Sequence, residues 1–207
     1  SRTVVLISPN HFFAGRGQII SSQYNWQTPY GVLKADQNIT LKLKETGAVN
    51  IDEAPFEKEH GVSNIVAFIK KTIPNAKFIP LIIKDTISKK ESESLISALE
   101  KVLPNDALII ASFDFSHYLP SGMADFHDEK SMVALDSLNY EKGDSLDIDS
   151  RSGLEIFLKI IKERGAESFT LFDHSNSAKV LDDQDIAETT SYVTGVFTTE
   201  EKEIEST

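Results

Sequence analysis

The stretch VVLISPNH (residues 4–11) begins as an unbroken apolar run and ends in polar side chains. An unbroken run, unlike an alternating one, is typical of a strand covered on both faces, as in a parallel or mixed sheet. Similar runs recur as FIPLII (78–83), ALIIA (107–111) and FTLF (169–172), and a β-branched, aromatic segment spans 191–198. We therefore expect a sheet of several strands that is largely parallel.

Helical patterns separate these runs. Residues 61–73 carry an apolar stripe and end before Pro74, and Ser88 with Glu91 forms a capping-box signature ahead of a second amphipathic segment. Further helices are expected from Ser121 onward and over 152–164. The alternation predicts an α/β fold: a single domain over 1–199 with a central largely parallel or mixed sheet flanked by helices, an antiparallel edge or hairpin near 18–23, and an acidic tail at 200–207.

Composition narrows the classes of function. The 207 residues include 21 basic and 32 acidic side chains, a net charge of -11 that disfavours binding to a nucleic-acid backbone. There is no cysteine, so any metal site needs His, Asp or Glu ligands. No apolar stretch approaches the roughly 20 residues that cross a bilayer. We expect a soluble, cytoplasmic protein with no nucleic-acid or membrane partner.

Four of the five histidines follow or precede predicted elements. His11, His117 and His174 come just after apolar runs, and His60 comes at the start of a predicted helix, whereas His127 lies inside one. Ligands of open α/β sheets bind outside the carboxyl ends of the strands. The placement therefore favours a shared histidine-rich pocket over four unrelated surface histidines.

Two roles suit these side chains. Two histidines with a carboxylate are the ligand set of non-haem Fe(II) oxygenases, and zinc accepts the same ligands. In SFDFSHYL (112–119), Asp114 could orient His117 for proton transfer to or from a substrate. The alternative is structural: Asp114 caps the next turn and His117 packs beside Tyr118.

Five motifs, in order, resemble the Memo-like family, of the AmmeMemoRadiSam system protein B type. They are ISPNH (7–11), QTPYGVLKAD (27–36), EH (59–60), DFSH (114–117) with Asp128 beyond it, and NS (176–177) followed by YVTG (192–195). The resemblance implies a fold similar to class III extradiol ring-cleavage dioxygenases. It also implies that His11 and His60 are metal ligands and that His117, accompanied by Asp114, is the acid/base histidine.

Three departures from the family pattern affect these expectations. Nothing here matches the strand and Pro-His-Ala-Gly-Tyr type motif with which the family usually begins, so that strand is expected to be missing. Gly61 follows His60 where the family commonly has Ser. The third ligand position of the family falls on Lys179, whose ammonium has no lone pair for a metal, so His174 is a candidate third ligand.

Three functions follow as hypotheses. The first is a metal-dependent, dioxygenase-like oxidoreductase with Fe(II), or with copper or zinc, at His11 and His60. The second is a noncatalytic module without metal that binds a peptide or small anion in the same pocket, with Lys179 supplying charge. The third is a metal-dependent hydrolase. In each case the partner is a small molecule or peptide.

Overall fold

The computed structural model describes residues 2–139, 146–183 and 185–199. It divides into two compact units, residues 1–113 and 114–207, and each unit is described by itself. The predicted acidic tail at 200–207 lies outside the described residues. Within the described ranges, no helix combines the length and apolar character needed to cross a membrane.

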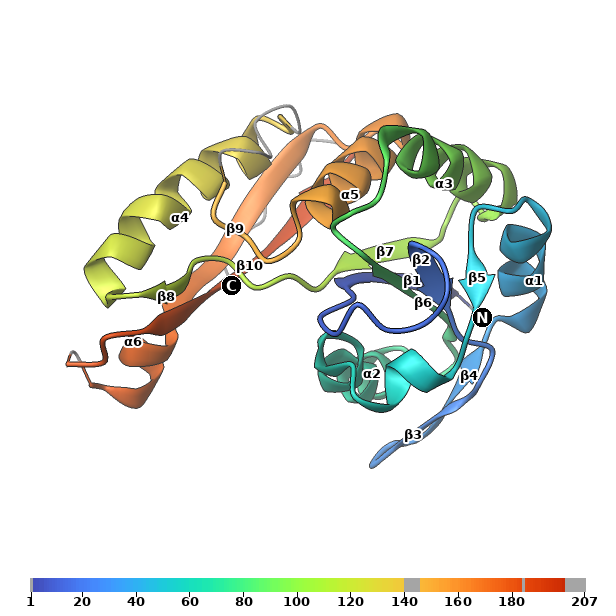
Figure 1. Ribbon diagram of the computed structural model, residues 1–207, viewed down its shortest axis with the longest axis horizontal. Coiled ribbons are helices and arrows are strands. Elements are labelled where there is room, and N and C mark those ends of the chain that lie inside the picture. The colour runs from blue at the N-terminus through green and yellow to red at the C-terminus, as the bar shows by residue number, and fades with distance from the viewer. Residues whose placement is uncertain (1, 140–145, 184, 200–207) are drawn as a thin grey trace. The chain divides into compact units, whose positions relative to one another are not determined.

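The first unit contains a seven-stranded mixed sheet (Figure 1). Its central strand, β1 (Thr3–Pro9), pairs in parallel with β6 (Lys77–Ile83) and β7 (Leu108–Ala111). The remaining strands are β4 (Gly31–Ala35), parallel to β6; β3 (Trp26–Thr28), antiparallel to β4; β2 (Ile19–Ser21), antiparallel to β6; and β5 (Asn50–Ile51), parallel to β2. The sheet is therefore parallel at its centre and antiparallel at its margins.

Every residue of β1 is buried, as its unbroken apolar run predicts. On one face, β1 and β6 pack against the apolar stripe of α2 (His60–Thr72), in a core that includes Val4, Phe78 and Val66. The helices α1 (Gln37–Glu45) and α3 (Lys89–Val102) lie on the opposite face from α2 (Figure 1), and a short 3-10 turn, η1 (Ala54–Glu57), precedes α2. The sheet is thus covered on both sides.

The second unit is built on an antiparallel sheet in the order β8 (His117–Leu119), β10 (Thr189–Thr198), β9 (Ser168–Asn176). The helix α4 (Ser121–Asp136) packs against β9 and β10, and Phe157 of α5 (Arg151–Glu163) contacts Phe197. A short helix, α6 (Ser177–Leu181), begins where β9 ends.

The α/β class and the mixed sheet with flanking helices are confirmed, and segment 18–23 does contain an antiparallel strand, β2. The expectation that FTLF (169–172) is a strand covered on both faces was wrong, because β9 is antiparallel and Phe172 is 60% exposed. A four-residue run is too short to reveal which of its faces meets solvent. The domain boundaries, the missing first strand and the likeness to extradiol dioxygenases stay predictions.

Candidate functional site

His11 lies in the turn that follows β1. Asn10, which is 2% exposed, shapes this turn: its side chain donates to the Ala14 carbonyl at 2.9 Å and accepts from the Ala14 N–H at 3.0 Å. The Asn10 N–H in turn donates to the carbonyl of Ile83 at the end of β6, at 2.8 Å. The turn that presents His11 is therefore anchored to the carboxyl ends of two parallel strands.

Glu59 joins His11 to the start of α2. Its carboxylate, 1% exposed, accepts from the backbone N–H of His11 at 3.0 Å and lies 2.5 Å from His11 Nδ1. It also caps α2 by accepting from the Gly61 N–H at 3.1 Å. Because an ionised carboxylate can only accept, His11 Nδ1 carries a hydrogen, and Nε2 carries the lone pair of the neutral ring.

His60 is the first residue of α2, and its ring stacks on that of His11 with 4.1 Å between the centroids. The structure therefore brings together the two histidines that the sequence analysis proposes as metal ligands. His60 is exposed, and the aromatic ring of Phe12 lies edge-on to it at 6.4 Å.

Two opposing effects act on the pKa of Glu59. Burial, the largest influence, raises the pKa. The hydrogen bond and charge of His11, with the backbone N–H groups of Gly61 and His11, outweigh burial and hold the pKa below its ordinary value of 4.5. Glu59 is therefore a carboxylate at neutral pH, the form that holds the imidazole of His11.

Gly61 allows β1 and α2 to approach closely. A Cβ at Gly61 would lie 2.1 Å from Ser8 Oγ and 3.3 Å from His11 Cε1. This contact explains the departure from the family pattern noted above: with Ser8 buried at the end of β1, the position after His60 has no room for a side chain.

The donor set fits a divalent transition metal. Ligand atoms of His11, Glu59 and His60 all lie within 4.8 Å of one another. A carboxylate that accepts from the non-ligating nitrogen of a histidine is the usual support of a metal-bound imidazole, because it fixes the tautomer and the orientation of the ring. The metal-ligand roles of His11 and His60 stay predictions.

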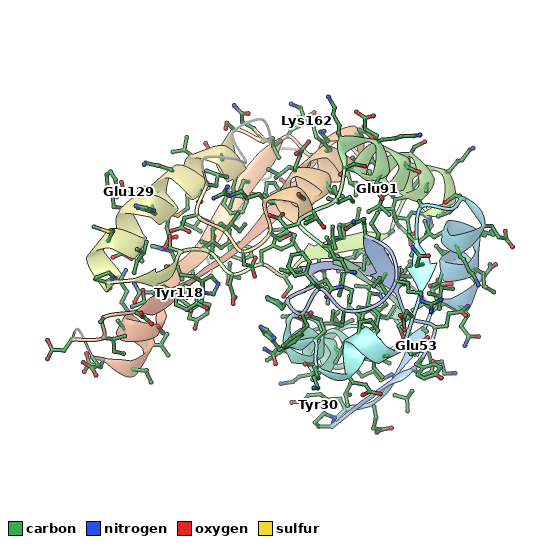
Figure 2. The ribbon with its side chains drawn as sticks, viewed as in Figure 1. Tyr30, Glu53, Glu91, Tyr118, Glu129 and Lys162 are labelled. Atoms are coloured by element: carbon green, nitrogen blue, oxygen red, sulfur yellow. The ribbon has the colours of Figure 1, made fainter. Side chains whose placement is uncertain are left out.

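Asp114 and His117 lie in the second unit, on the segment that leads into β8. His117 Nε2 is 3.7 Å from Asp114 Oδ2, an ion-pair separation that exceeds hydrogen-bond length, and Nδ1 is 3.2 Å from Thr190 Oγ1. The ring also lies 5.4 Å from that of Tyr118, as the structural alternative expects. Tyr118, labelled in Figure 2, is 75% exposed and has a left-handed backbone, φ 56°.

A third acidic side chain accompanies this pair. Asp149, just before α5, donates its N–H to the Asp114 carbonyl at 3.0 Å, and its carboxylate lies within 4.8 Å of ligand atoms of Asp114 and His117. The acid/base role of His117 and Asp114 stays a prediction. His127, which the sequence analysis places apart from the other histidines, instead pairs with Asp147 at 3.2 Å.

Lys179 and His174 are both engaged within the second unit. Lys179 Nζ lies 2.8 Å from Asp125 Oδ1, and His174 Nε2 lies 2.8 Å from Asp128 Oδ2. Lys179 therefore forms an ion pair, which does not favour its use as an anion-binding charge. The role of His174 as third ligand to a metal at His11 and His60 stays a prediction.

The sequence analysis did not single out Glu59, Asp149 or Asp125 as site residues. Glu59 had one usable signal, since it stands directly before a candidate ligand at a helix start. Asp149 lies 32 residues beyond His117, and no local pattern joins the two.

Comparison with known proteins agrees with the motifs. The sequence model of the family described as Memo-like protein matches residues 1–196. A MEMO1 family protein of Methanococcus vannielii is 28% identical over 197 residues, which cover 87% of this chain and 68% of the relative. Counterparts from Pyrobaculum aerophilum and Aquifex aeolicus are 28% identical over 207 residues (93% and 71%) and 31% identical over 141 residues (67% and 52%). Because the family match extends over nearly the whole chain, this protein belongs to the Memo-like family.

Proposed function

We propose that this protein binds a divalent transition-metal ion at His11 and His60 and uses it in dioxygenase-type redox chemistry on a small molecule. The observation that carries the proposal is the Glu59 carboxylate, which holds the Nδ1–H of His11 while the ring of His60 stacks beside it. Two imidazoles in this arrangement suit Fe(II), and copper or zinc would accept the same donors.

Each residue has a distinct task in this proposal. His11 and His60 donate ligand nitrogens, and Glu59 fixes which nitrogen of His11 faces the ion. The ion, when bound, would supply one-electron chemistry or polarise a substrate oxygen. His117 would take a proton from a substrate hydroxyl or return one at Nε2, with Thr190 holding Nδ1 and Asp114 favouring the protonated ring.

Metal analysis tests the first part of the proposal. Protein purified without chelator is expected to carry iron, copper or zinc, and a His11→Ala/His60→Ala variant is expected to lose about one ion per chain. His127→Ala is the matched control, because this histidine pairs with Asp147. A wild-type chain that is empty and takes up no added Fe(II) would favour a metal-free binding module instead.

Oxygen consumption tests the redox part. Fe(II)-loaded protein with a panel of catechols is expected to consume O2, and a His117→Gln variant is expected to lose most of the rate while it keeps its metal. Hydrolysis of ester or phosphoester probes without O2 uptake would instead assign the metal to a hydrolase.

A further inference from the structure

A second group of metal-ligating side chains lies in the second unit, between α4 and the antiparallel pair β9–β10. Asp125 and Asp128 come from α4, and His174 comes from β9. One ligand atom from each lies within 4.8 Å of the other two. None of the proposed functions above assigns a role to the two aspartates.

Asp128 is the most buried member of the group, with 0% of its surface exposed. One carboxylate oxygen accepts from the Ser116 hydroxyl at 2.7 Å, and the other lies 2.8 Å from His174 Nε2. A fully buried carboxylate requires donors or a cation around it. One of its two oxygens therefore faces a position that a proton on His174 fills and that a metal ion could fill equally.

Asp125 is already bound to a cation. Its Oδ1 atom accepts from Lys179 Nζ at 2.8 Å and from Asn176 Nδ2 at 3.1 Å, and lies 4.0 Å from His174 Nε2. Lys179 is partly exposed, so its ammonium can exchange this carboxylate for water. Positive charge is thus the counterpart that this pair of carboxylates needs.

Two hydroxyls supply an independent observation. Ser131 Oγ and Ser191 Oγ are buried and have no hydrogen-bond partner among the described residues. Such a group costs about 1–3 kcal/mol unless water or an ion meets it. Their positions point to the same group of side chains.

Strand register and helix geometry place both hydroxyls. Ser191 is directly opposite Asn176 in the β9–β10 ladder, so its side chain is on the same face of the sheet as those of Asn176 and His174. Ser131 follows Asp128 by three residues on α4, which puts it on the same side of the helix. The interior between α4 and the strands therefore holds more polar atoms than the described residues satisfy.

We propose that Asp125, Asp128 and His174 form a second divalent-cation site. A mixed set of carboxylate oxygens and one imidazole suits Zn2+ or Mn2+. On binding, the ion takes the place of the proton between His174 Nε2 and Asp128 Oδ2, the proton passes to solvent, and the Lys179 ammonium moves from Asp125 into water. Water on the ion then reaches the Ser191 hydroxyl.

This site does not rest on the proposed function, because its ligands are all in the second unit and exclude His11 and His60. Its role follows from what it joins: the ion links α4 to β9 through side chains of both. A cation bound only to the folded chain adds its binding free energy to stability. Zn2+ should therefore raise the melting temperature of a chain that lacks the first site.

The test uses the full chain with His11→Ala/His60→Ala, so that failure of the first site cannot affect the result. Titration calorimetry with Zn2+ is expected to show one ion per chain. Adding Asp125→Asn or His174→Gln should weaken binding about tenfold or more. Adding Lys179→Met should tighten it about tenfold, because a competing positive charge beside a ligand oxygen is removed.

Matched controls separate the site from general effects of charge. Asp173→Asn changes the neighbouring, exposed residue of β9, and His127→Gln changes a histidine of α4 outside the group; both should leave Zn2+ affinity unchanged. Absence of Zn2+ and Mn2+ binding in the His11→Ala/His60→Ala chain overturns the proposal. Equal loss in Asp125→Asn and Asp173→Asn does the same, since it assigns the affinity to net charge.

Discussion

At the scale of single residues, the Glu59 carboxylate combines three tasks in one buried group. It caps α2, fixes the backbone of the His11 turn and holds the His11 ring. Glutamate is not among the usual N-cap residues, which are Ser, Thr, Asp and Asn. Its use at this position is explained by reach, since the longer side chain spans from the helix start to His11.

Glu59→Gln should weaken Zn2+ binding at His11 and His60 about 10- to 100-fold, because the amide cannot hold the Nδ1–H of His11 as strongly and its NH2 group competes in the wrong orientation. Competition with a chromophoric chelator measures the affinity. Glu57→Gln, an exposed change two residues earlier, is the control. Equal affinities in wild type and Glu59→Gln would remove Glu59 from the site.

Gly61→Ala should destabilise the first unit by about 1–3 kcal/mol, because the new methyl group would overlap Ser8 Oγ. In a Ser8→Ala background the same change should cost nothing or stabilise by up to about 1 kcal/mol, since the remaining contact is 3.4 Å and Ala favours the helix. Urea unfolding followed by fluorescence of the single tryptophan, Trp26, reports on this unit. Without rescue by Ser8→Ala, the close approach is not the cause.

The sequence predicted His11 and His60 as a pair but not what holds them. Order and spacing of motifs carry family ligands, whereas the Glu59 contact depends on where a turn after β1 meets the start of α2. The same limit applies to Asp125 and His174, which are 49 residues apart in the chain. Contacts between distant residues come from the fold, and a single sequence contains no direct signal of them.

At the scale of elements, local signals were reliable where a cap and an apolar stripe coincided. The capping box of α3 is present in full: Ser88 accepts from the Glu91 N–H, and the Glu91 carboxylate accepts from the Ser88 N–H at 2.9 Å. Glu91 is labelled at the start of this helix in Figure 2. The sequence did not predict α1, because ITLKLK alternates like a strand; Asp36, which accepts from the Ile39 N–H, makes it a helix.

Ser88→Ala should lower the free energy of unfolding by about 1 kcal/mol at pH 7. The hydrogen bonds from Ser88, side chain first and then backbone, lower the pKa of Glu91 below its ordinary 4.5. A depressed carboxyl pKa stabilises the fold above the unfolded value, and this contribution is lost as pH falls through the folded value. Wild type and Glu91→Gln should therefore differ at pH 7 and converge near pH 3 in urea unfolding. A difference that persists at pH 3 would contradict this role.

At the scale of the whole molecule, the fold class was predictable because it rests on periodicity, and the division of labour between sheets was not. Unbroken runs correctly indicated β1, β6 and β7, whose neighbours are parallel strands on a buried sheet. The run in β9 has the same composition but pairs antiparallel with β10. Apolar content sets burial, whereas the direction of the partner strand depends on the connection between them.

The position of β1 has a consequence for the slowest motions of the chain. Buried along its whole length and bonded to a parallel strand on each side, β1 can release its amide hydrogens to solvent only when the sheet itself opens. In deuterium exchange, the amides of residues 4–7 should therefore be among the last to exchange, with protection that equals the global stability of the first unit. If the slowest amides of β9 and β10 exchange at the same rate, the two units unfold together; if faster, the second opens alone while β1 stays protected.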